Sequence, residues 1–199
     1  MLIMDEKTKA CIVYSNKNKE QFIAELFDFL KYESVSTDFE KEENIEQCAE
    51  FLIHHLKALG AENIDLIKTK KHPVVYAEFI TDKQKPTVLV YGHYDVQPED
   101  PIELWKSPPF QPEIRDNYIY ARGVADDKGQ VFCHLKAIES WLKTTGSLPV
   151  NIKLIIEGEE EIGSPNLEDI LIKYKDRLKA DVVVIKNLQE TCIERSQVT

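Results

Sequence analysis

The sequence predicts an α/β domain whose largely parallel central sheet is flanked by helices. Short apolar runs bounded by glycine or proline, such as residues 88–91, recur along the chain and are typical of strands covered on both faces. Segments with apolar residues at helical spacing separate several of these runs. Because strands and helices alternate, a parallel sheet with helical crossovers is the expected architecture.

Four segments carry apolar residues on one helical face. In the first, Phe22, Leu26 and Leu30 recur at every fourth position. Gly60 and Gly146 close the second and third segments, as glycine often does at the end of a helix. The predicted helices cover residues 19–32, 42–60, 126–146 and 166–178.

The expected strands lie between these helices. They cover residues 64–67, 73–80, 88–91, 118–123, 150–158 and 180–185. We predict that the strands at 88–91, 150–158 and 180–185 are buried, because each contains a run of apolar residues, which is uninterrupted in 88–91. No repeat, low-complexity segment or linker divides the chain, which predicts a single domain over residues 1–199.

The composition excludes several classes of function. The 199 residues carry a formal net charge of -10, which argues against a nucleic-acid partner or an anionic membrane because both require a basic surface. No apolar run approaches the length of about 18 residues that suggests a membrane span, and no secretory signal is recognisable. The four cysteines are far apart, so a structural zinc site or a disulfide framework is not expected and a reduced, cytoplasmic setting fits.

Polar residues follow the predicted buried strand 88–91. His93 and Asp95 are two positions apart, so in extended chain they point to the same side. A metal-binding histidine usually donates its other ring N–H to a carboxylate or carbonyl group, and Asp95 is placed to be that partner or a ligand itself. The alternative is a capped turn with a solvated histidine.

Carboxylates occupy two further positions of the same kind. Asp126 and Asp127 stand at the start of a predicted helix, where one helix cap and one exposed acid are the alternative interpretation. Glu159, Glu160 and Glu161 follow the predicted strand 150–158, where the alternative is a hydrated acidic loop. Parallel strands bring their carboxyl ends together, so the histidine and the acids predict a catalytic Zn²⁺ or Mn²⁺ site, which can hold two ions.

The same residues carry a family resemblance. The stretches "VLVYGHYDVQP", "YARGVADDKGQ" and "EGEEEIGS" resemble the di-zinc metallopeptidases that include carnosinase, cytosolic non-specific dipeptidase, aminoacylase and glutamate carboxypeptidase. Details such as "DVQP" and "DDKG" are most similar to the dipeptidase and carnosinase branch. The resemblance covers residues 20–185, and three such motifs in this order are strongly specific.

The resemblance implies a role for each matching residue. His93 binds one zinc ion, and Asp95 lies behind it and orients its ring. Asp126 bridges the two ions. Glu160 is the general base that takes a proton from the bridging water, and Glu161 binds the second zinc ion. Zinc is therefore the expected cofactor, with manganese as an alternative.

Two neighbouring acids receive no such role. Glu159 falls outside the family's Glu-Glu-x-Gly pattern, so we expect it to be solvated or to support a ligand from behind. Asp127 stands at a variable position beside Asp126 and is assigned no metal.

The chain departs from the family in two ways. Lys186 and Asn187 stand where the family carries another aspartate ligand. The lid domain, used for dimerisation and substrate binding, and the C-terminal segment with the last histidine ligand have no counterpart in the 199 residues, and the other four histidines do not occupy that position. The resemblance therefore implies the N-terminal part of a zinc-peptidase-like catalytic domain.

Two functions remain open. The resemblance implies a hydrolase that cleaves the amide bond of a dipeptide or a small N-acyl amino acid with a metal-bound water, in a family where a homodimer is one expected assembly. The alternative is a truncated or degenerate relative that acts as a folded interaction fragment without catalysis. A deacetylase or esterase would share the ligands, and only a panel of substrates separates it from a peptidase.

Overall fold

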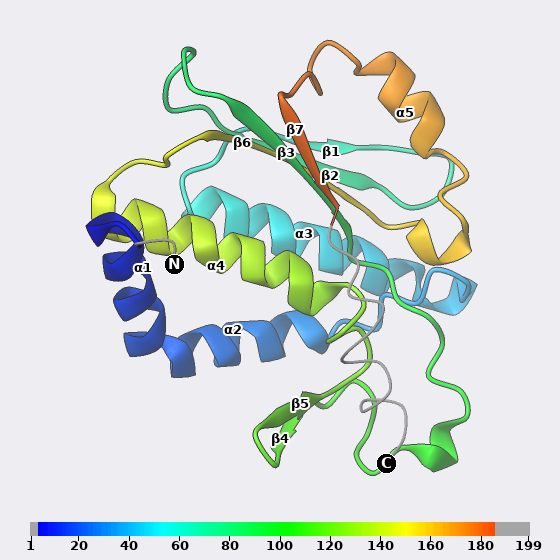
Figure 1. Cartoon of the computed structure of the whole chain (residues 1–199). Helices are drawn as coiled ribbons and strands as arrows, with labels where there is room; N and C mark the ends of the chain where they lie inside the picture. The colour runs from blue at the N-terminus through cyan, green and yellow to red at the C-terminus, as the bar shows by residue number, and fades with distance from the viewer. Residues whose placement is uncertain (1–3, 186–199) are drawn as a thin grey trace.

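The computed structural model describes residues 4–185, which form a central sheet with helices on both faces (Figure 1). The helices α1 to α4 lie on one face, and α5 lies on the other (Figure 1). The helices are α1 (Glu6–Lys17), α2 (Lys19–Leu30), α3 (Glu42–Ala58), α4 (Lys128–Thr145) and α5 (Leu167–Lys173), with 3-10 turns η1 (Phe39–Lys41), η2 (Ile102–Leu104) and η3 (Glu160–Ile162). No helix in this part of the chain is long and apolar enough to cross a membrane.

The main sheet has the strand order β1-β2-β6-β3-β7. Its strands are β1 (Glu62–Ile67), β2 (Val74–Phe79), β3 (Thr87–His93), β6 (Asn151–Glu157) and β7 (Val182–Ile185). The pairs β3–β6 and β3–β7 are parallel, whereas β2 is antiparallel to both of its neighbours. Only β2 is therefore reversed among these strands, and the predicted largely parallel sheet flanked by helices is confirmed.

Two apolar layers hold the sheet between the helices. On one face, α3 and α4 pack against β2, β3 and β6, with Leu52, Leu56 and Leu135 fully buried in this layer. On the other face, Ile170 of α5 packs with Ile155 and other sheet residues. Because both faces of the sheet are covered, the backbone at the carboxyl ends of β3 and β6 is held in place by packing on either side.

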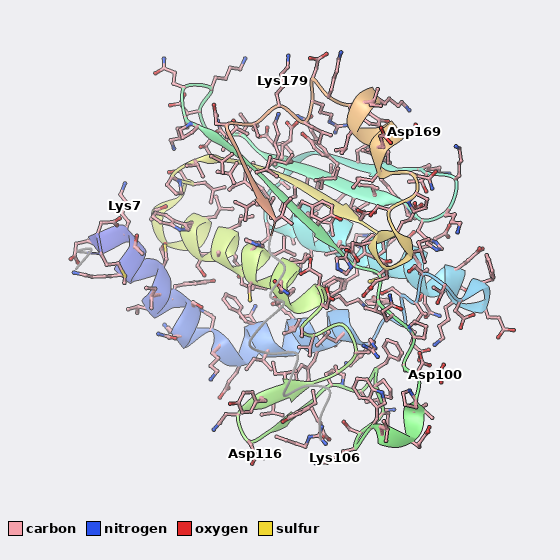
Figure 2. The ribbon with its side chains drawn as sticks, turned by 45° about the vertical axis from the view of Figure 1, so that its right-hand side comes forward. Lys7, Asp100, Lys106, Asp116, Asp169 and Lys179 are labelled. Atoms are coloured by element: carbon pink, nitrogen blue, oxygen red, sulfur yellow. The ribbon has the colours of Figure 1, made fainter. Side chains whose placement is uncertain are left out.

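A small hairpin lies apart from the main sheet. It consists of β4 (Glu113–Arg115) and β5 (Tyr118–Tyr120), which pair in antiparallel fashion. The hairpin and the loop that carries Asp100 and Lys106 lie at the end of the molecule opposite to Asp169 and Lys179 (Figure 2). This loop and the segment after β5 form one side of the candidate site described below.

The main differences from the sequence-based expectation concern α1, α5 and β7. Helix α1 was not predicted, because it buries only Cys11 and so shows no apolar stripe. Helix α5 ends at Lys173, before the expected residue 178. The prediction that strand 180–185 is buried is wrong, since β7 pairs only with β3 and leaves Val182, Val183 and Ile185 52%, 56% and 67% exposed.

Candidate active site

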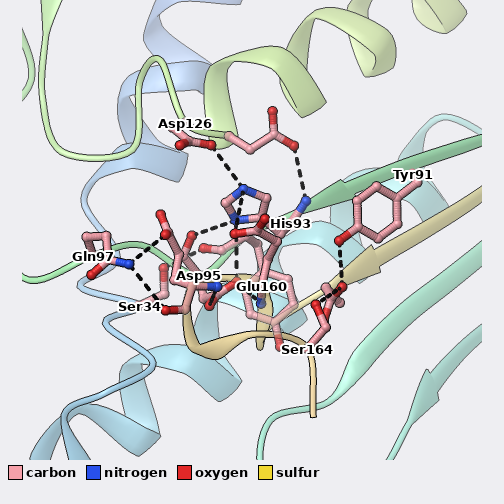
Figure 3. Close-up of polar contacts among 12 residues, drawn as sticks. Ser34, Tyr91, His93, Asp95, Gln97, Asp126, Glu160 and Ser164 are labelled. Atoms are coloured by element: carbon pink, nitrogen blue, oxygen red, sulfur yellow. Dashed lines mark hydrogen bonds and ion pairs between the residues drawn. The ribbon is translucent and has the colours of Figure 1, made fainter. Parts of the chain in front are cut away.

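His93 is the last residue of β3, and its ring lies between two carboxylates (Figure 3). Nε2 lies 3.1 Å from Oδ1 of Asp126, and Nδ1 lies 3.1 Å from the carbonyl oxygen and 3.4 Å from Oδ1 of Asp95. Strand β3 is in register with β6, so His93 stands opposite Glu157 and the turn after β6 is close by. The expected meeting of the two strand ends is confirmed.

Gly92 lets helix α4 approach this strand end. A Cβ atom at this position would lie 2.6 Å from Cγ2 of Val131 and 2.7 Å from Oδ2 of Asp127. Both distances are shorter than real Cβ contacts, so only glycine leaves room for the start of α4. This close approach brings Asp126 to the ring of His93.

Asp95 joins the histidine to the turn η3. Its carboxylate is fully buried, and its oxygens accept hydrogen bonds from the backbone N–H of Glu160 at 3.2 Å and of Glu161 at 3.0 Å. The same carboxylate faces Nδ1 of His93. The resemblance implies a position behind the histidine, and the Asp95 carboxylate lies 3.4 Å from Nδ1; the bonds to the turn were not anticipated.

The two aspartates before α4 lie in different surroundings. Asp126 is half-exposed and faces His93, whose hydrogen bond lowers the pKa of this carboxyl group despite partial burial. Asp127 is buried, and its Oδ2 accepts a hydrogen bond from the backbone N–H of His93 at 3.1 Å. Asp127 occupies the N-cap position, but its side chain makes no capping bond to α4. Burial raises the pKa of Asp127 to about 7.

Glu160 and Glu161 both reach the region of His93 from η3. One ligand atom each of His93, Asp126 and Glu161 lie within 4.8 Å of one another, so these three side chains can hold a metal ion. Glu161 also accepts a hydrogen bond from Nε2 of Gln97 at 2.8 Å, and burial raises the pKa of its carboxyl group. Oε2 of Glu160 lies 3.9 Å from Nε2 of His93, and the side chain is 37% exposed, so water has access to it.

The charges of the site favour a cation. Burial alone would lower the pKa of His93, but the contacts with Asp126 and Asp95 outweigh burial and raise it to about 11. These carboxylates stabilise the positive charge of the protonated imidazole, so they also favour the binding of another cation. Carboxylates gathered at one strand end repel one another, and a bound cation would offset that repulsion.

Glu159 differs from the two glutamates that follow it. It is 1% exposed, so the expectation that it is solvated is wrong, and the alternative that it supports the site from behind remains. Its oxygens accept hydrogen bonds from the backbone N–H of His72 at 2.9 Å and from Nδ2 of Asn166 at 2.8 Å. Sequence reasoning missed these partners, because loop residues far apart in the chain gave no periodic signal. Lys186 and Asn187 lie outside the described residues.

A second group of possible ligands already surrounds a cation. Glu25, His55 and Glu139 lie close together between α2, α3 and α4. The ammonium group of Lys136 forms ion pairs with both glutamates and lies 3.0 Å from Nε2 of His55. This cluster is therefore a partly buried ion-pair network.

A cavity of about 390 Å³ opens beside the candidate metal ligands. Asp126 and Glu161 line it on one side, and Trp105 and Arg122 line it on another. The guanidinium group of Arg122 lies over the ring of Trp105 at 5.3 Å and donates a hydrogen bond to the carbonyl oxygen of Pro98. The space is of the size that small ligands occupy in proteins.

Curated proteins with similar sequences include metallodipeptidases. The chain is 36% identical over 185 residues to the Cys-Gly metallodipeptidase DUG1 of Candida albicans, a match that covers 85% of this chain and 38% of that protein. It is 32% identical over 188 residues to the Beta-Ala-His dipeptidase of Mus musculus, which covers 87% of this chain and 38% of that protein. The chain spans less than half the length of these relatives.

Solved structures and a family model agree with this likeness. The structure of human carnosine dipeptidase 1 matches with a TM-score of 0.85 and 31% identity, over 92% of this chain and 41% of that one. The M20 family metallo-carboxypeptidase Sso-CP2 of Sulfolobus solfataricus matches with a TM-score of 0.73 and 44% identity, over 92% of this chain and 37% of that one. Residues 89–197, more than half of the chain, match the family model. The chain belongs to Peptidase family M20/M25/M40, a family of metallopeptidases.

Proposed function

We propose that this chain supplies the metal-binding and proton-transfer groups of a dipeptidase catalytic centre. The observation that carries the proposal is the convergence of His93, Asp126 and Glu161, with Glu160 at the same edge of the sheet. The substrate class is a dipeptide or a small N-acyl amino acid, since the similar proteins are named for Cys-Gly and Beta-Ala-His. The adjoining cavity has the volume for such a ligand.

The donor set fits a divalent zinc ion, with manganese as the alternative. One imidazole nitrogen and two carboxylates are donors that both metals accept in catalytic sites, and the group contains no cysteine. Nδ1 of His93 faces Asp95, which leaves Nε2 directed toward the carboxylates. An imidazole held in this way has a fixed tautomer and ring orientation, as metal-binding histidines require. Asp126 is the candidate bridging ligand if two ions bind.

Glu160 is the proposed general base. When bound, a divalent ion acts as a Lewis acid that polarises the scissile carbonyl group and lowers the pKa of water. Glu160 takes one proton from the attacking water, and the oxygen adds to the carbonyl carbon. The same carboxyl group then returns the proton to the leaving amine as the C–N bond breaks. The exposure of Glu160 and its position beside His93 support this role.

The test combines hydrolysis with metal binding. Hydrolysis of cysteinylglycine and of β-alanylhistidine is measured with Zn²⁺ or Mn²⁺ for the wild type, Glu160→Gln and the control Glu168→Gln on the exposed side of α5. Glu160→Gln is expected to lose about 10²–10⁴-fold in rate while the control keeps its activity. Calorimetry should show that Glu160→Gln still binds metal and that His93→Ala does not. Equal rates for Glu160→Gln and the wild type contradict the mechanism.

A second function has its own observation. Strand β7 exposes Val182, Val183 and Ile185 at the edge of the sheet, and exposed apolar edge strands pair with other chains. This favours an interaction fragment that associates through β7 without catalysis. Tight binding of two zinc ions together with turnover would exclude it.

A further inference from the structure

Glu159 closes the turn that carries Glu160 and Glu161. Its carbonyl oxygen accepts hydrogen bonds from the backbone N–H of Ser164 at 2.8 Å and of Ile162 at 3.2 Å. The residue itself precedes η3 in the N-cap position. The carbonyl oxygen of Glu159 therefore closes the turn from Glu159 to Ser164.

The side chain of Glu159 binds two other parts of the chain. Oε1 accepts from the backbone N–H of His72 at 2.9 Å, and Oγ1 of Thr69 lies 2.5 Å from the same oxygen. Oε2 accepts from Nδ2 of Asn166, the residue before α5, at 2.8 Å. The loop between β1 and β2 is held in turn, because the ring of His72 bonds the carbonyl oxygen of Ser36 at 3.0 Å. A carboxylate that is 1% exposed thus has donors on both of its oxygens.

Two carboxylates consequently hold η3 from different sides. Asp95 accepts the N–H groups of Glu160 and Glu161 from the side of β3. The side chain of Glu159, the residue directly before η3, is bonded to the loop at Thr69–His72 and to Asn166. Hydrogen bonds to an ionised carboxylate are roughly twice as strong as neutral ones. With the side-chain bonds of Glu159 removed, η3 would keep its attachment to Asp95 and lose its attachment to the loop at Thr69–His72 and to Asn166.

We propose that Glu159 is a positioning residue that fixes the direction in which Glu160 and Glu161 leave the turn. The inference rests on the proposed function for what these two side chains do; the attachment of the turn does not depend on it. Residues that orient a ligand from behind commonly change metal affinity about 10–100-fold when they are replaced. A role limited to fold stability would instead lower the unfolding temperature and leave the turn unchanged.

The decisive measurement is amide hydrogen exchange of the metal-free full chain, followed by NMR. In Glu159→Gln one accepting oxygen becomes an NH₂ group that faces a donor, so we expect the N–H groups of Glu160 and Glu161 to lose about tenfold or more in protection. The matched control Glu168→Gln removes the same charge from an exposed position and should keep both amides within about twofold of the wild type.

Two further variants grade the effect. Asn166→Ala removes one donor to Oε2, so the same two amides should lose protection to a smaller extent. In Glu159→Gln/Asn166→Asp the donor and the acceptor exchange places, and protection should partly return. If Glu159→Gln does not fold, the result for Asn166→Ala decides the question by the same criterion.

Metal binding gives the second readout. Zinc affinity of folded Glu159→Gln should fall about tenfold, whereas Glu168→Gln should bind like the wild type. The inference is overturned if the amides of Glu160 and Glu161 keep their protection within about twofold in the folded variants, whatever the change in unfolding temperature. If the wild type binds no zinc, the proposed function fails, and hydrogen exchange still decides the role of Glu159.

Discussion

Replacing Asp95 by asparagine should weaken both the fold and the metal site. The wild-type carboxylate is fully buried and accepts the N–H groups of Glu160 and Glu161 with separate oxygens. Asparagine keeps one oxygen and turns an NH₂ group toward the other N–H, which leaves a buried donor without an acceptor. Such a group costs about 1–3 kcal/mol, and Asp95→Ala, which loses both acceptors, should cost about 2–6 kcal/mol.

The magnitude is measurable by urea unfolding followed by circular dichroism. The expected loss for Asp95→Asn is a sizeable part of the roughly 5–15 kcal/mol by which small proteins are stable, so the midpoint should shift clearly. Calorimetric titration with zinc should show a fall of about 10–100-fold in affinity, because the ring of His93 loses the carboxylate facing Nδ1.

Asp169→Asn is the matched control for this prediction. Asp169 lies on α5 at the surface, 76% exposed, and its ion pair with Lys70 is 3.9 Å long, so the same substitution there should change the free energy of unfolding by less than about 0.5 kcal/mol. If Asp95→Asn is as stable as Asp169→Asn and binds zinc equally well, the reasoning from the two backbone hydrogen bonds is refuted.

Two further changes test other parts of the structure. Lys136→Met leaves the carboxylates of Glu25 and Glu139 without their cation and should cost about 3–5 kcal/mol at neutral pH, as measured by urea unfolding. Burial alone would raise the pKa of Glu25, but Lys136 outweighs it and lowers this pKa below its ordinary value of 4.5. The stabilisation is therefore present at neutral pH and lost as the pH falls through the lowered pKa, so the difference between variant and wild type should shrink in acid. Gly92→Ala should cost about 1–3 kcal/mol through its clash with Val131, and Gly92→Ala/Val131→Ala should recover part of the clash, whereas an equal loss in both variants would contradict this explanation.

The parts of the candidate site that could be expected from the sequence lie at the ends of regular elements. His93 and Asp95 follow a strand whose apolar run is plain, and two parallel strands must end at the same edge of a sheet. Asp126 was found in the same way, because it precedes a helix with a clear apolar face. The pattern of apolar residues therefore locates the polar residues that stand at the ends of strands and helices.

Other features depend on contacts between loops, which periodicity does not report. The burial of Glu159 arises from Thr69, His72 and Asn166, and these residues belong to two irregular segments far apart in the chain. The exposure of β7 has a different cause. Its apolar run looks like that of a central strand, but the position of a strand within a sheet is set by the order of pairing and not by its own residues.

The attachment of η3 through main-chain amides has a consequence for redesign. Asp95 bonds to the N–H groups of Glu160 and Glu161, and these groups exist whatever side chain the two positions carry. Exchanging Glu161 for aspartate or histidine would therefore alter the ligand and leave the anchor of the backbone intact. The two positions are accordingly places to change metal selectivity or proton transfer, and an exchange of Glu161 would have to replace its side-chain bond from Gln97.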